Sequence, residues 1–289
     1  MTDINESAPA SPPATQHEKA LAFHALHRAD RPLALANVWD VAGARIVAEA
    51  GAPAIATTSA GVAWALGTPD GGKLGRALAV ELIARVTAAV ALPVTADIED
   101  GFADSPAGVG ETVAAVLAAG AVGINLEDSD RSGRAPLLPV DEQAARLAAA
   151  RAAADAAGIP LYINARIDSY LRGVGADAEA RRQETLDRAA AYVAAGASGV
   201  FVPGLTDPAE LSAIAAGLTV PLNVLVGAGA PTVEELGKAG VARVSLGSAV
   251  AESAYAVVRR AARELYRQGS YDEVAEAIPY PELNALLNG

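Results

Sequence analysis

The feature that most constrains the fold is a repeat of short apolar runs, each introduced by small residues that include a glycine. The phrase Glu-Ala-Gly-Ala at 49–52 returns as Ala-Ala-Gly-Ala at 118–121 and 194–197, and as Lys-Ala-Gly-Val at 238–241. A helix that ends at glycine and leads directly into a buried strand produces such a phrase. The runs that we interpret as buried parallel strands are residues 33–37, 54–58, 94–97, 122–127, 161–165, 199–202, 222–226 and 243–246.

Eight strands that alternate with helical stretches predict a parallel α/β sheet. Pro93, Pro160 and Pro221 lie immediately before or at strand starts, where a missing backbone donor does least harm. No Gly-x-Gly-x-x-Gly follows the first strand, which argues against an open dinucleotide-binding sheet. We therefore predict one (β/α)8 TIM-barrel domain over residues 17–289, and a disordered leader over the Ala-, Pro-, Ser- and Thr-rich residues 1–16.

Composition excludes several classes of function. The 289 residues contain no cysteine, and the three histidines, His17, His24 and His27, all lie in the first 27 residues, so a bound metal is expected to use oxygen ligands or one of these histidines. A net charge of −12 argues against nucleic acid or an anionic membrane as a partner. There is neither an apolar run long enough to cross a bilayer nor a signal-peptide pattern, so we expect a cytoplasmic enzyme.

Acidic residues stand at the carboxyl ends of neighbouring predicted strands, where the active sites of such barrels lie. Asp97 and Glu99 follow the third strand and Glu127 ends the fourth. Three clustered carboxylates repel one another unless a cation neutralises them, and oxygen ligands favour Mg²⁺ or Mn²⁺. We expect Asp97 to bind the ion directly and the two glutamates to bind it largely through water. The alternative is that these acids only cap the helices that follow.

Three further features point to a substrate pocket at the same end of the barrel. Arg166 directly follows the fifth strand and is suited to bidentate binding of a carboxylate or phosphate, although an ion pair with Asp168 is the alternative. The turn Ser59, Ala60, Gly61 offers backbone N–H groups to an oxyanion. Trp39 either lines the pocket or covers the barrel rim.

Six motifs, in this order along the chain, resemble those of the isocitrate lyase/phosphoenolpyruvate mutase superfamily. The resemblance extends from about residue 21 to about residue 268, and the co-ordered set is far more specific than any single motif. The motifs are NVWD at 37–40, TSAG at 58–61, GTPDG at 67–71, DIEDG at 97–101, INLED at 124–128 and NARID at 164–168.

This resemblance implies a Mg²⁺-dependent barrel in a homotetramer or dimer, in which the last helix, here residues 248–267, is swapped between subunits. It also implies stabilisation of an enolate of a small 2-oxo acid while a bond to its third carbon breaks or forms. By motif match, the resemblance assigns catalytic roles to Asp97, Glu127 and Arg166, metal binding to Asp97, Glu99 and Glu127, and substrate binding to Trp39, Ser59, Ala60, Gly61, Asp70, Arg166 and Asn223.

The loop after the fourth strand, residues 129–138, departs from the better-known members. It lacks the cysteine and histidine of the lyase loop, and residues 127–141 lack the Asn-Ser pair of the mutase loop. We therefore expect a lyase or decarboxylase that cleaves a C–C bond of a 2-oxo acid or related dicarboxylate. The alternatives are a C–P bond enzyme, such as a phosphonopyruvate hydrolase or mutase-like protein, and a non-catalytic 2-oxo acid binder. Arg131 and Arg134 either contact a distal substrate carboxylate when the loop closes or lie on a solvated surface.

Overall fold

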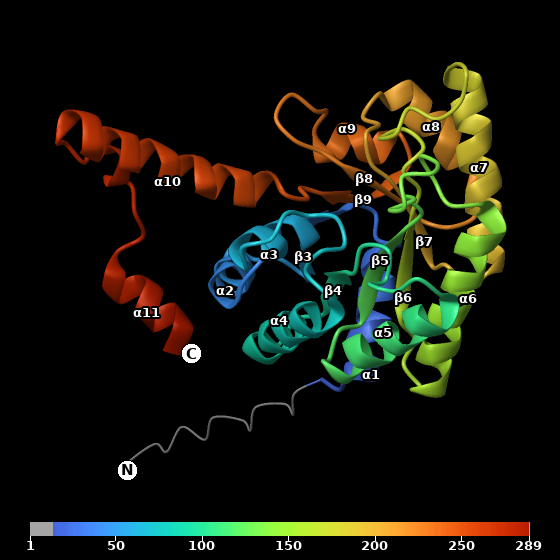
Figure 1. The fold of residues 1–289 in the computed structure, drawn as a ribbon, viewed down its shortest axis with the longest axis horizontal. Coiled ribbons are helices and arrows are strands. Elements are labelled where there is room, and N and C mark those ends of the chain that lie inside the picture. Colours follow the sequence, from blue (N-terminus) through green and yellow to red (C-terminus); the bar gives the residue numbers. More distant parts are fainter. Residues whose placement is uncertain (1–13, 289) are drawn as a thin grey trace, which may run out of the picture.

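Nine short parallel strands form one sheet in the computed structural model, which describes residues 14–288 (Figure 1). The order in the sheet is β1-β9-β8-β7-β6-β5-β4-β3-β2. Its two edge strands, β1 and β2, are separated along the chain only by Ala36, so the sheet curves into a nearly closed barrel, as predicted. The strands are β1 (Leu33–Leu35), β2 (Asn37–Val38), β3 (Ile55–Thr57), β4 (Val94–Asp97), β5 (Gly123–Glu127), β6 (Tyr162–Arg166), β7 (Gly199–Val202), β8 (Leu222–Leu225) and β9 (Val241–Ser245).

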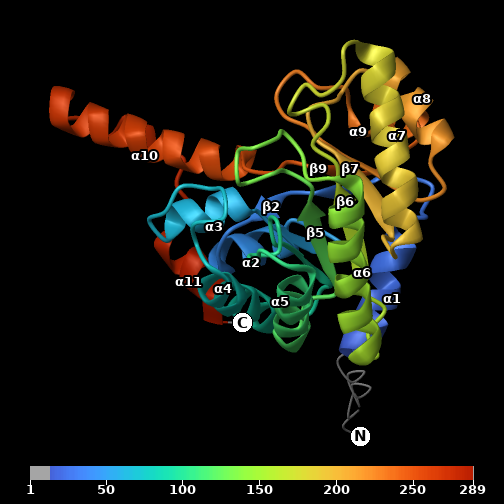
Figure 2. The ribbon, with the colours of Figure 1, turned by 45° about the vertical axis from the view of Figure 1, so that its right-hand side comes forward.

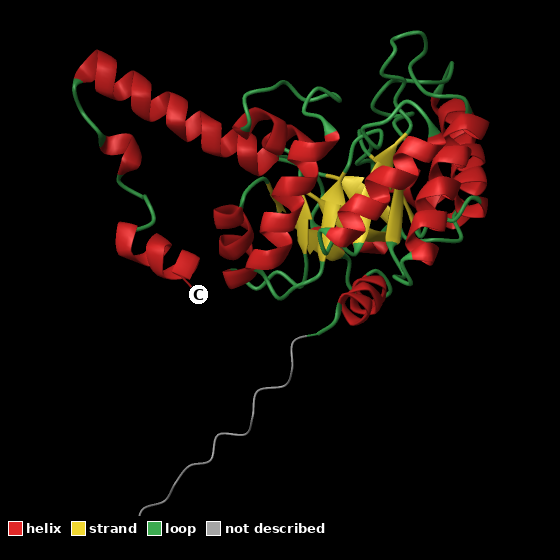
Figure 3. Cartoon of the chain, turned by 60° about the horizontal axis from the view of Figure 1, so that its bottom comes forward, coloured by secondary structure: helices red, strands yellow, loops and turns green. Residues whose placement is uncertain are grey.

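Helices surround these strands (Figure 3). Many begin at a side chain that accepts an N–H from the first helical turn, as Asp40 does from Gly43 and Asp177 from Ala180. The helices are α1 (Gln16–Leu26), α2 (Val41–Glu49), α3 (Ser59–Ala65), α4 (Arg76–Ala89), α5 (Pro106–Ala118), α6 (Val140–Ala156), α7 (Ala178–Ala194), α8 (Pro208–Gly217), α9 (Val233–Lys238), α10 (Ala249–Gln268), the 3-10 helix η1 (Asp272–Val274) and α11 (Tyr280–Asn288).

The first predicted strand, residues 33–37, is divided in the structure. β1 pairs with β9 up to Leu35, and β2 pairs with β3 from Asn37 onward. The backbone changes neighbours at Ala36, and this crossing brings the two edges of the sheet together. The eight predicted strands therefore correspond to nine observed strands, because β1 and β2 together form the first one.

The strand register places polar side chains side by side inside the barrel mouth. Asp97 on β4 pairs with Asn125 on β5, and Glu127 on β5 pairs with Arg166 on β6. Paired residues of parallel strands project from the same face of a sheet. The register alone therefore brings an acid beside an amide and an acid beside a guanidinium.

The opposite end of the barrel is closed by α1. Phe23 is fully buried there against the base of the strands, and His27 stacks on Tyr162 with ring centroids 3.8 Å apart. The helix begins at Gln16, whose side chain donates to the carbonyls of Leu117 and Ala121. The last residue of the predicted leader is therefore helical, whereas residues 1–13 lie outside the described residues.

The helix α10 extends away from the barrel, and α11 turns back to lie against α2 (Figures 1 and 2). Arg45 of α2 donates to the carbonyl of Leu286 in α11. Val258 and Leu265 on α10 are 64% and 52% exposed, so its apolar side is uncovered along the chain described. Within residues 14–288, no helix combines the length and the apolar character needed to cross a membrane.

Candidate functional site

A cavity of about 150 Å³ opens at the carboxyl ends of the strands. It lies where the βα loops of a barrel place active sites. Several predicted site residues line it, together with residues that sequence reasoning did not select. The lining residues are Asn37, Thr58, Ser59, Ala60, Asp70, Asp97, Asn125, Arg166, Phe201, Pro203, Leu225, Ser245, Gly247 and Ser248.

The predicted substrate turn and the predicted metal ligand are in direct contact. The hydroxyl of Ser59 donates to Oδ2 of Asp97 over 2.8 Å, and the backbone N–H of Ser59 donates to the same oxygen over 3.3 Å. Ser59 and Ala60 begin α3, so their amides belong to the first helical turn, which has no acceptor within the helix. The turn therefore presents donors at the cavity wall beside a carboxylate.

Arg166 is held by two acids. Its Nε and Nη2 donate to the two carboxylate oxygens of the buried Asp168 over 2.6 and 3.1 Å, and its Nη1 lies 2.9 Å from Oε2 of Glu127. Arg166 forms the ion pair with Asp168 that was one alternative, and it also lines the cavity, where the other alternative places a substrate anion. A guanidinium has five donors, and these contacts leave donors on Nη1 and Nη2 for a ligand.

Asp168 is the residue that orients Arg166, and sequence reasoning considered it only as an alternative partner. It is completely buried, it accepts from the hydroxyl of Ser129 over 2.5 Å, and its backbone N–H donates to Asp128. The first contact holds the carboxylate and the second holds the backbone that carries it, so Asp168 can orient the guanidinium of Arg166.

Glu99 and Glu127 lie beside the cavity and share one cation, the guanidinium of Arg131. Nη2 of Arg131 is 3.2 Å from Oε2 of Glu99 and 2.5 Å from Oε1 of Glu127. The backbone of Glu99 has a φ of +52°, a left-handed conformation that costs a non-glycine residue about 1 kcal/mol or more. Such strain is typical of positions whose side chain must be aimed, and here it directs the carboxylate toward the other acids.

Burial and neighbouring charge shift the titration of these glutamates. Burial, together with the charges of Asp97 and Asp70, raises the pKa of Glu99 to about 7, although Arg131 and the Gly72 amide act against this rise. Burial also raises the pKa of Glu127, against the opposing effect of Arg166 and Arg131. The acids of the mouth outnumber its two arginines, Arg131 and Arg166. An excess of buried negative charge of this kind is typical of sites that bind cations.

The acids fit a hard divalent cation through their chemistry, with limited direct coordination. Carboxylate oxygens are the ligands that Mg²⁺ and Mn²⁺ prefer. In residues 14–288, no three acidic or histidine side chains converge closely enough to hold one ion together. Asp97 and Asp70 line the cavity, whereas Glu99 and Glu127 lie behind it. Two of the predicted acids therefore lie at the cavity wall and two lie away from it.

Besides Glu99 and Glu127, three more predicted site residues do not line the cavity. Trp39 packs against the apolar cluster of Val62, Leu74 and Ala79 beside the mouth. Gly61 lies so close to Trp39 and Ala251 that an added Cβ would be 2.9 and 3.2 Å from their Cβ atoms, which explains its small size. Asn223 is buried one layer below, where its Oδ1 accepts from Ser245.

Other lining residues were missed because they carry no acid or arginine signal. Asn37 bridges two parts of the mouth, since its Nδ2 donates to the Thr57 carbonyl and its Oδ1 accepts from the Gly247 amide over 2.8 Å. Phe201 lies beneath Arg166, with the guanidinium carbon 5.9 Å from the ring centroid. The strand register was the signal that would have found Asn125 and Phe201, because they pair with Asp97 and Arg166.

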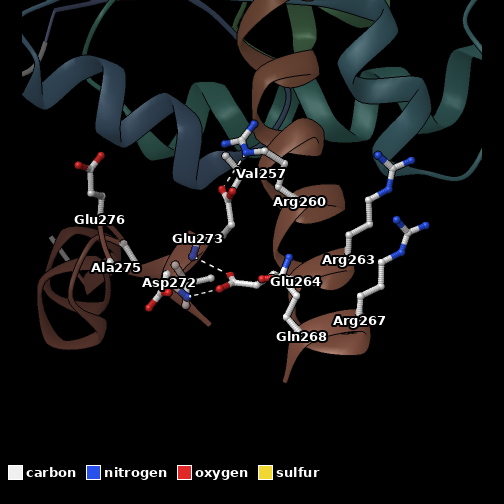
Figure 4. Close-up of a pocket in the computed structure, with 12 residues that line it drawn as sticks. Val257, Arg260, Arg263, Glu264, Arg267, Gln268, Asp272, Glu273, Ala275 and Glu276 are labelled. Atoms are coloured by element: carbon white, nitrogen blue, oxygen red, sulfur yellow. Dashed lines mark hydrogen bonds and ion pairs between the residues drawn. The ribbon is translucent and has the colours of Figure 1, made fainter. Parts of the chain in front are cut away.

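A larger hollow, of about 800 Å³, lies elsewhere, between α10 and η1 (Figure 4). Glu264 accepts there from the amides of Asp272 and Glu273 and from the hydroxyl of Ser270, and Arg260 pairs with Glu273 over 2.8 Å. These contacts hold the turn that follows α10. We place the functional site at the barrel mouth, because the hollow along α10 collects no comparable group of buried acids.

Together, the barrel, the buried acids and the oriented arginine define a class: (β/α)8 enzymes with an acidic mouth. A model of the phosphoenolpyruvate phosphomutase family matches residues 23–266. The chain belongs to this family, within the isocitrate lyase/phosphoenolpyruvate mutase superfamily, and the resemblance seen in its motifs is confirmed.

Sequence relatives cover most of the chain. An uncharacterized protein of Mycobacterium tuberculosis (strain H37Rv) is 37% identical over 92% of this chain and 96% of its own length. The 2-methylisocitrate lyase of Escherichia coli K12 is 32% identical over 86% of this chain and 84% of its own. The oxaloacetate decarboxylase of Ectopseudomonas mendocina is 31% identical over 73% and 71%.

Solved structures have the same fold. A candidate phosphonomutase from Burkholderia cenocepacia J2315 is 48% identical with a TM-score of 0.81, and the match covers 85% of this chain and 99% of that one. A phosphonopyruvate hydrolase in complex with oxalate and Mg²⁺ is 25% identical with a TM-score of 0.81, and the match covers 93% and 95%.

Proposed function

We propose that this protein is a Mg²⁺- or Mn²⁺-dependent lyase or decarboxylase that cleaves a C–C bond of a small 2-oxo acid or related dicarboxylate through an enolate. One observation carries the proposal: Ser59, Asp97 and Arg166 line the same small cavity, with two further acids directly behind it. The pocket thus pairs a grip for a carboxylate with a place for a cation.

Arg166 binds the substrate carboxylate in this proposal. Asp168 and Glu127 hold its guanidinium plane, so two donors remain aimed at the cavity and little side-chain freedom is lost on binding. The first turn of α3, where Ser59 and Ala60 line the cavity, supplies N–H donors for the oxygen that becomes negative as the bond to the third carbon breaks, while the Ser59 hydroxyl holds Asp97 in place. Donors fixed before the reaction stabilise such a charge without reorganisation.

The acids Asp97, Glu99 and Glu127 hold the divalent cation, with Asp97 as the direct ligand. The bound cation supplies Lewis-acid stabilisation of negative charge developing on the substrate. The raised pKa of Glu99 supports this assignment, because Asp97 and Asp70 contribute to it and a cation would relieve that repulsion. The Mg²⁺ found with the phosphonopyruvate hydrolase supports the same choice of ion.

The relatives narrow the substrate class to small acids. One acts on 2-methylisocitrate and another on oxaloacetate, and both substrates carry more than one carboxylate. A cavity of about 150 Å³ suits a substrate of this size or smaller. Because residues 127–141 lack the Asn-Ser pair of the mutase loop, we favour a C–C lyase or decarboxylase over C–P bond chemistry.

A substrate screen tests the proposal. The full-length protein with Mg²⁺ is incubated with oxaloacetate, alkylmalates, methylisocitrate and phosphonopyruvate, and pyruvate or other 2-oxo acids are measured. We expect turnover of at least one carboxylic acid that EDTA abolishes and Mg²⁺ restores. Turnover of phosphonopyruvate alone would favour the C–P alternative. Thermal stabilisation by these acids without any turnover would favour a non-catalytic binder.

We further propose a homo-oligomer in which α10 is exchanged between subunits. An apolar groove of about 710 Å³ lies on the outside of β1 and β9, between α2 and α9, where the eighth helix of a barrel would pack. The chain's own α10 extends away from this groove, and its apolar side chains Tyr255, Val258 and Leu265 are exposed. In the exchanged arrangement the partner's α10 would fill this groove, and this chain's α10 would fill the equivalent groove of the partner.

Light scattering after gel filtration tests the oligomer. We expect a dimer or tetramer for the wild type, and dissociation by Val258→Arg, which places a charge on the apolar side of α10. Asp187→Arg, at an exposed position on α7 far from α10, is the control and leaves the assembly intact. A monomeric wild-type protein would contradict the exchange.

A further inference from the structure

Arg131 lies on the same carboxylate oxygens that the proposed cation requires. One nitrogen, Nη2, is 3.2 Å from Glu99 Oε2 and 2.5 Å from Glu127 Oε1. Both glutamate side chains are almost fully buried, whereas 28% of the arginine side chain is exposed. The guanidinium thus enters from the loop side and ends between two acids that have little access to water.

The loop that carries Arg131 is a hairpin closed at its base. Ser129 and Leu137 form an antiparallel bridge, and the side chain of Asp130 accepts from the amides of Ser132 and Ala135. Residues 131–136 are exposed. Among them, only Arg131 makes side-chain hydrogen bonds beyond the hairpin within the described chain, because Arg134 bonds only to Ser132. One arginine therefore ties the tip of the hairpin to the site.

A second loop meets the same contact. The amide of Gly72 donates to Oε2 of Glu99, the oxygen that also receives Arg131. At Gly71, with φ +106°, an added Cβ would lie 2.7 Å from Nη1 of Arg131, so only glycine allows the guanidinium to approach. The loop that carries Asp70 and the hairpin are thus joined through Arg131 and Glu99.

We propose that Arg131 is a latch that competes with the divalent cation for Glu99 and Glu127, so that loading of the metal releases the hairpin 129–137. This inference rests on the proposed function. A guanidinium and a cation with its water shell cannot occupy the same space between the two carboxylates, and both are attracted by the same charge. Binding of either one therefore opposes the other, and the coupling acts equally in both directions.

Titration with Mn²⁺ alone, followed by the electron paramagnetic resonance signal of the free ion, tests the latch on the full-length protein. We expect Arg131→Gln to bind Mn²⁺ about 10-fold more tightly than the wild type, since one competing charge is removed. Arg134→Gln is the matched control in the same hairpin, and its affinity stays within about 2-fold of the wild type. Arg131→Lys keeps the charge and gives an intermediate affinity.

Trypsin provides a second measurement, because Arg131 and Arg134 are both cleavage sites. Mn²⁺ should speed cleavage within residues 129–137 of the wild type, whereas a ligand that merely stabilised the fold would slow it. In Arg131→Gln, cleavage after Arg134 should be fast and insensitive to Mn²⁺. A small chromogenic trypsin substrate in the same mixture corrects for any effect of the ion on the protease.

The outcomes separate the latch from the proposed function. Equal or weaker Mn²⁺ binding by Arg131→Gln, with the wild type still binding the ion, overturns the latch and leaves the metal-dependent function standing. Absence of Mn²⁺ binding in the wild type and in both glutamine variants overturns the metal site and the latch together.

Discussion

The two ends of the barrel bury charge and aromatic surface in opposite ways. At the mouth, Glu99 and Glu127 are buried together beside two arginines, with a left-handed backbone at Glu99. At the base, Phe23, His27 and Tyr162 form an aromatic plug with no acid in it. The mouth tolerates strain and repulsion that a ligand can relieve, whereas the base packs its aromatic rings beside one fully buried guanidinium, that of Arg243. The comparison teaches that function and stability are separated along the barrel axis.

The largest effect is expected at the mouth, from Asp97→Asn. Removing one negative charge while keeping the shape should lower metal-dependent turnover by at least about 10³-fold, because the proposed direct ligand of the cation loses its charge. The melting temperature should change little. Turnover on the best substrate of the screen and Mn²⁺ affinity are measured together, and a variant that keeps wild-type activity would refute the assigned role.

At the base, Phe23→Ala should act on stability alone. Phe23 is fully buried, and such truncations cost about 3–5 kcal/mol of unfolding free energy. Chemical denaturation measures this loss, and turnover per folded molecule should stay near the wild-type value. Leu21→Ala on the same helix is the control, because Leu21 is 51% exposed and its loss should cost about 0.5 kcal/mol or less. A strong loss of turnover in folded Phe23→Ala would break the separation of the two ends.

Arg166→Lys should raise KM by about 10- to 100-fold with a smaller change in kcat, since an ammonium cannot reproduce the paired donors that Asp168 orients. Steady-state kinetics on the best substrate measure both constants. An unchanged KM would show that the substrate carboxylate binds elsewhere.

The smallest effect concerns the pH dependence of stability at the base. Burial lowers the pKa of His27 from 6.5 to about 3. Below pH 6.5 the unfolded chain therefore binds a proton that the folded chain does not, and the unfolding free energy falls by at most about 1.4 kcal/mol per pH unit until pH 3. The difference in unfolding free energy between the wild type and His27→Gln, measured from pH 7.5 to 5, isolates this residue. Parallel curves for the two proteins would contradict the assignment.

Much of the barrel was predictable because its signals are local. The recurring Ala-Gly phrases located the strands, since a helix end and a buried run are encoded by consecutive residues. The acids and Arg166 were found at strand ends because a parallel barrel gathers all such ends at one rim. The sequence could not show whether Trp39 and Asn223 line the cavity, because that depends on the depth in the barrel at which each side chain lies.

Contacts between segments that are distant along the chain were decided only by the tertiary structure. The first predicted strand is split into β1 and β2 because it forms both edges of the sheet, and its two parts pair with β9 and β3. The placement of Arg131 between Glu99 and Glu127 depends on how far one hairpin leans toward another loop, which no periodicity encodes. By itself the sequence determined the strands of the barrel and the charged residues at their ends, because both depend on residues that are close together in the chain. The tertiary structure determined which charges meet, because that depends on loop conformation and strand register.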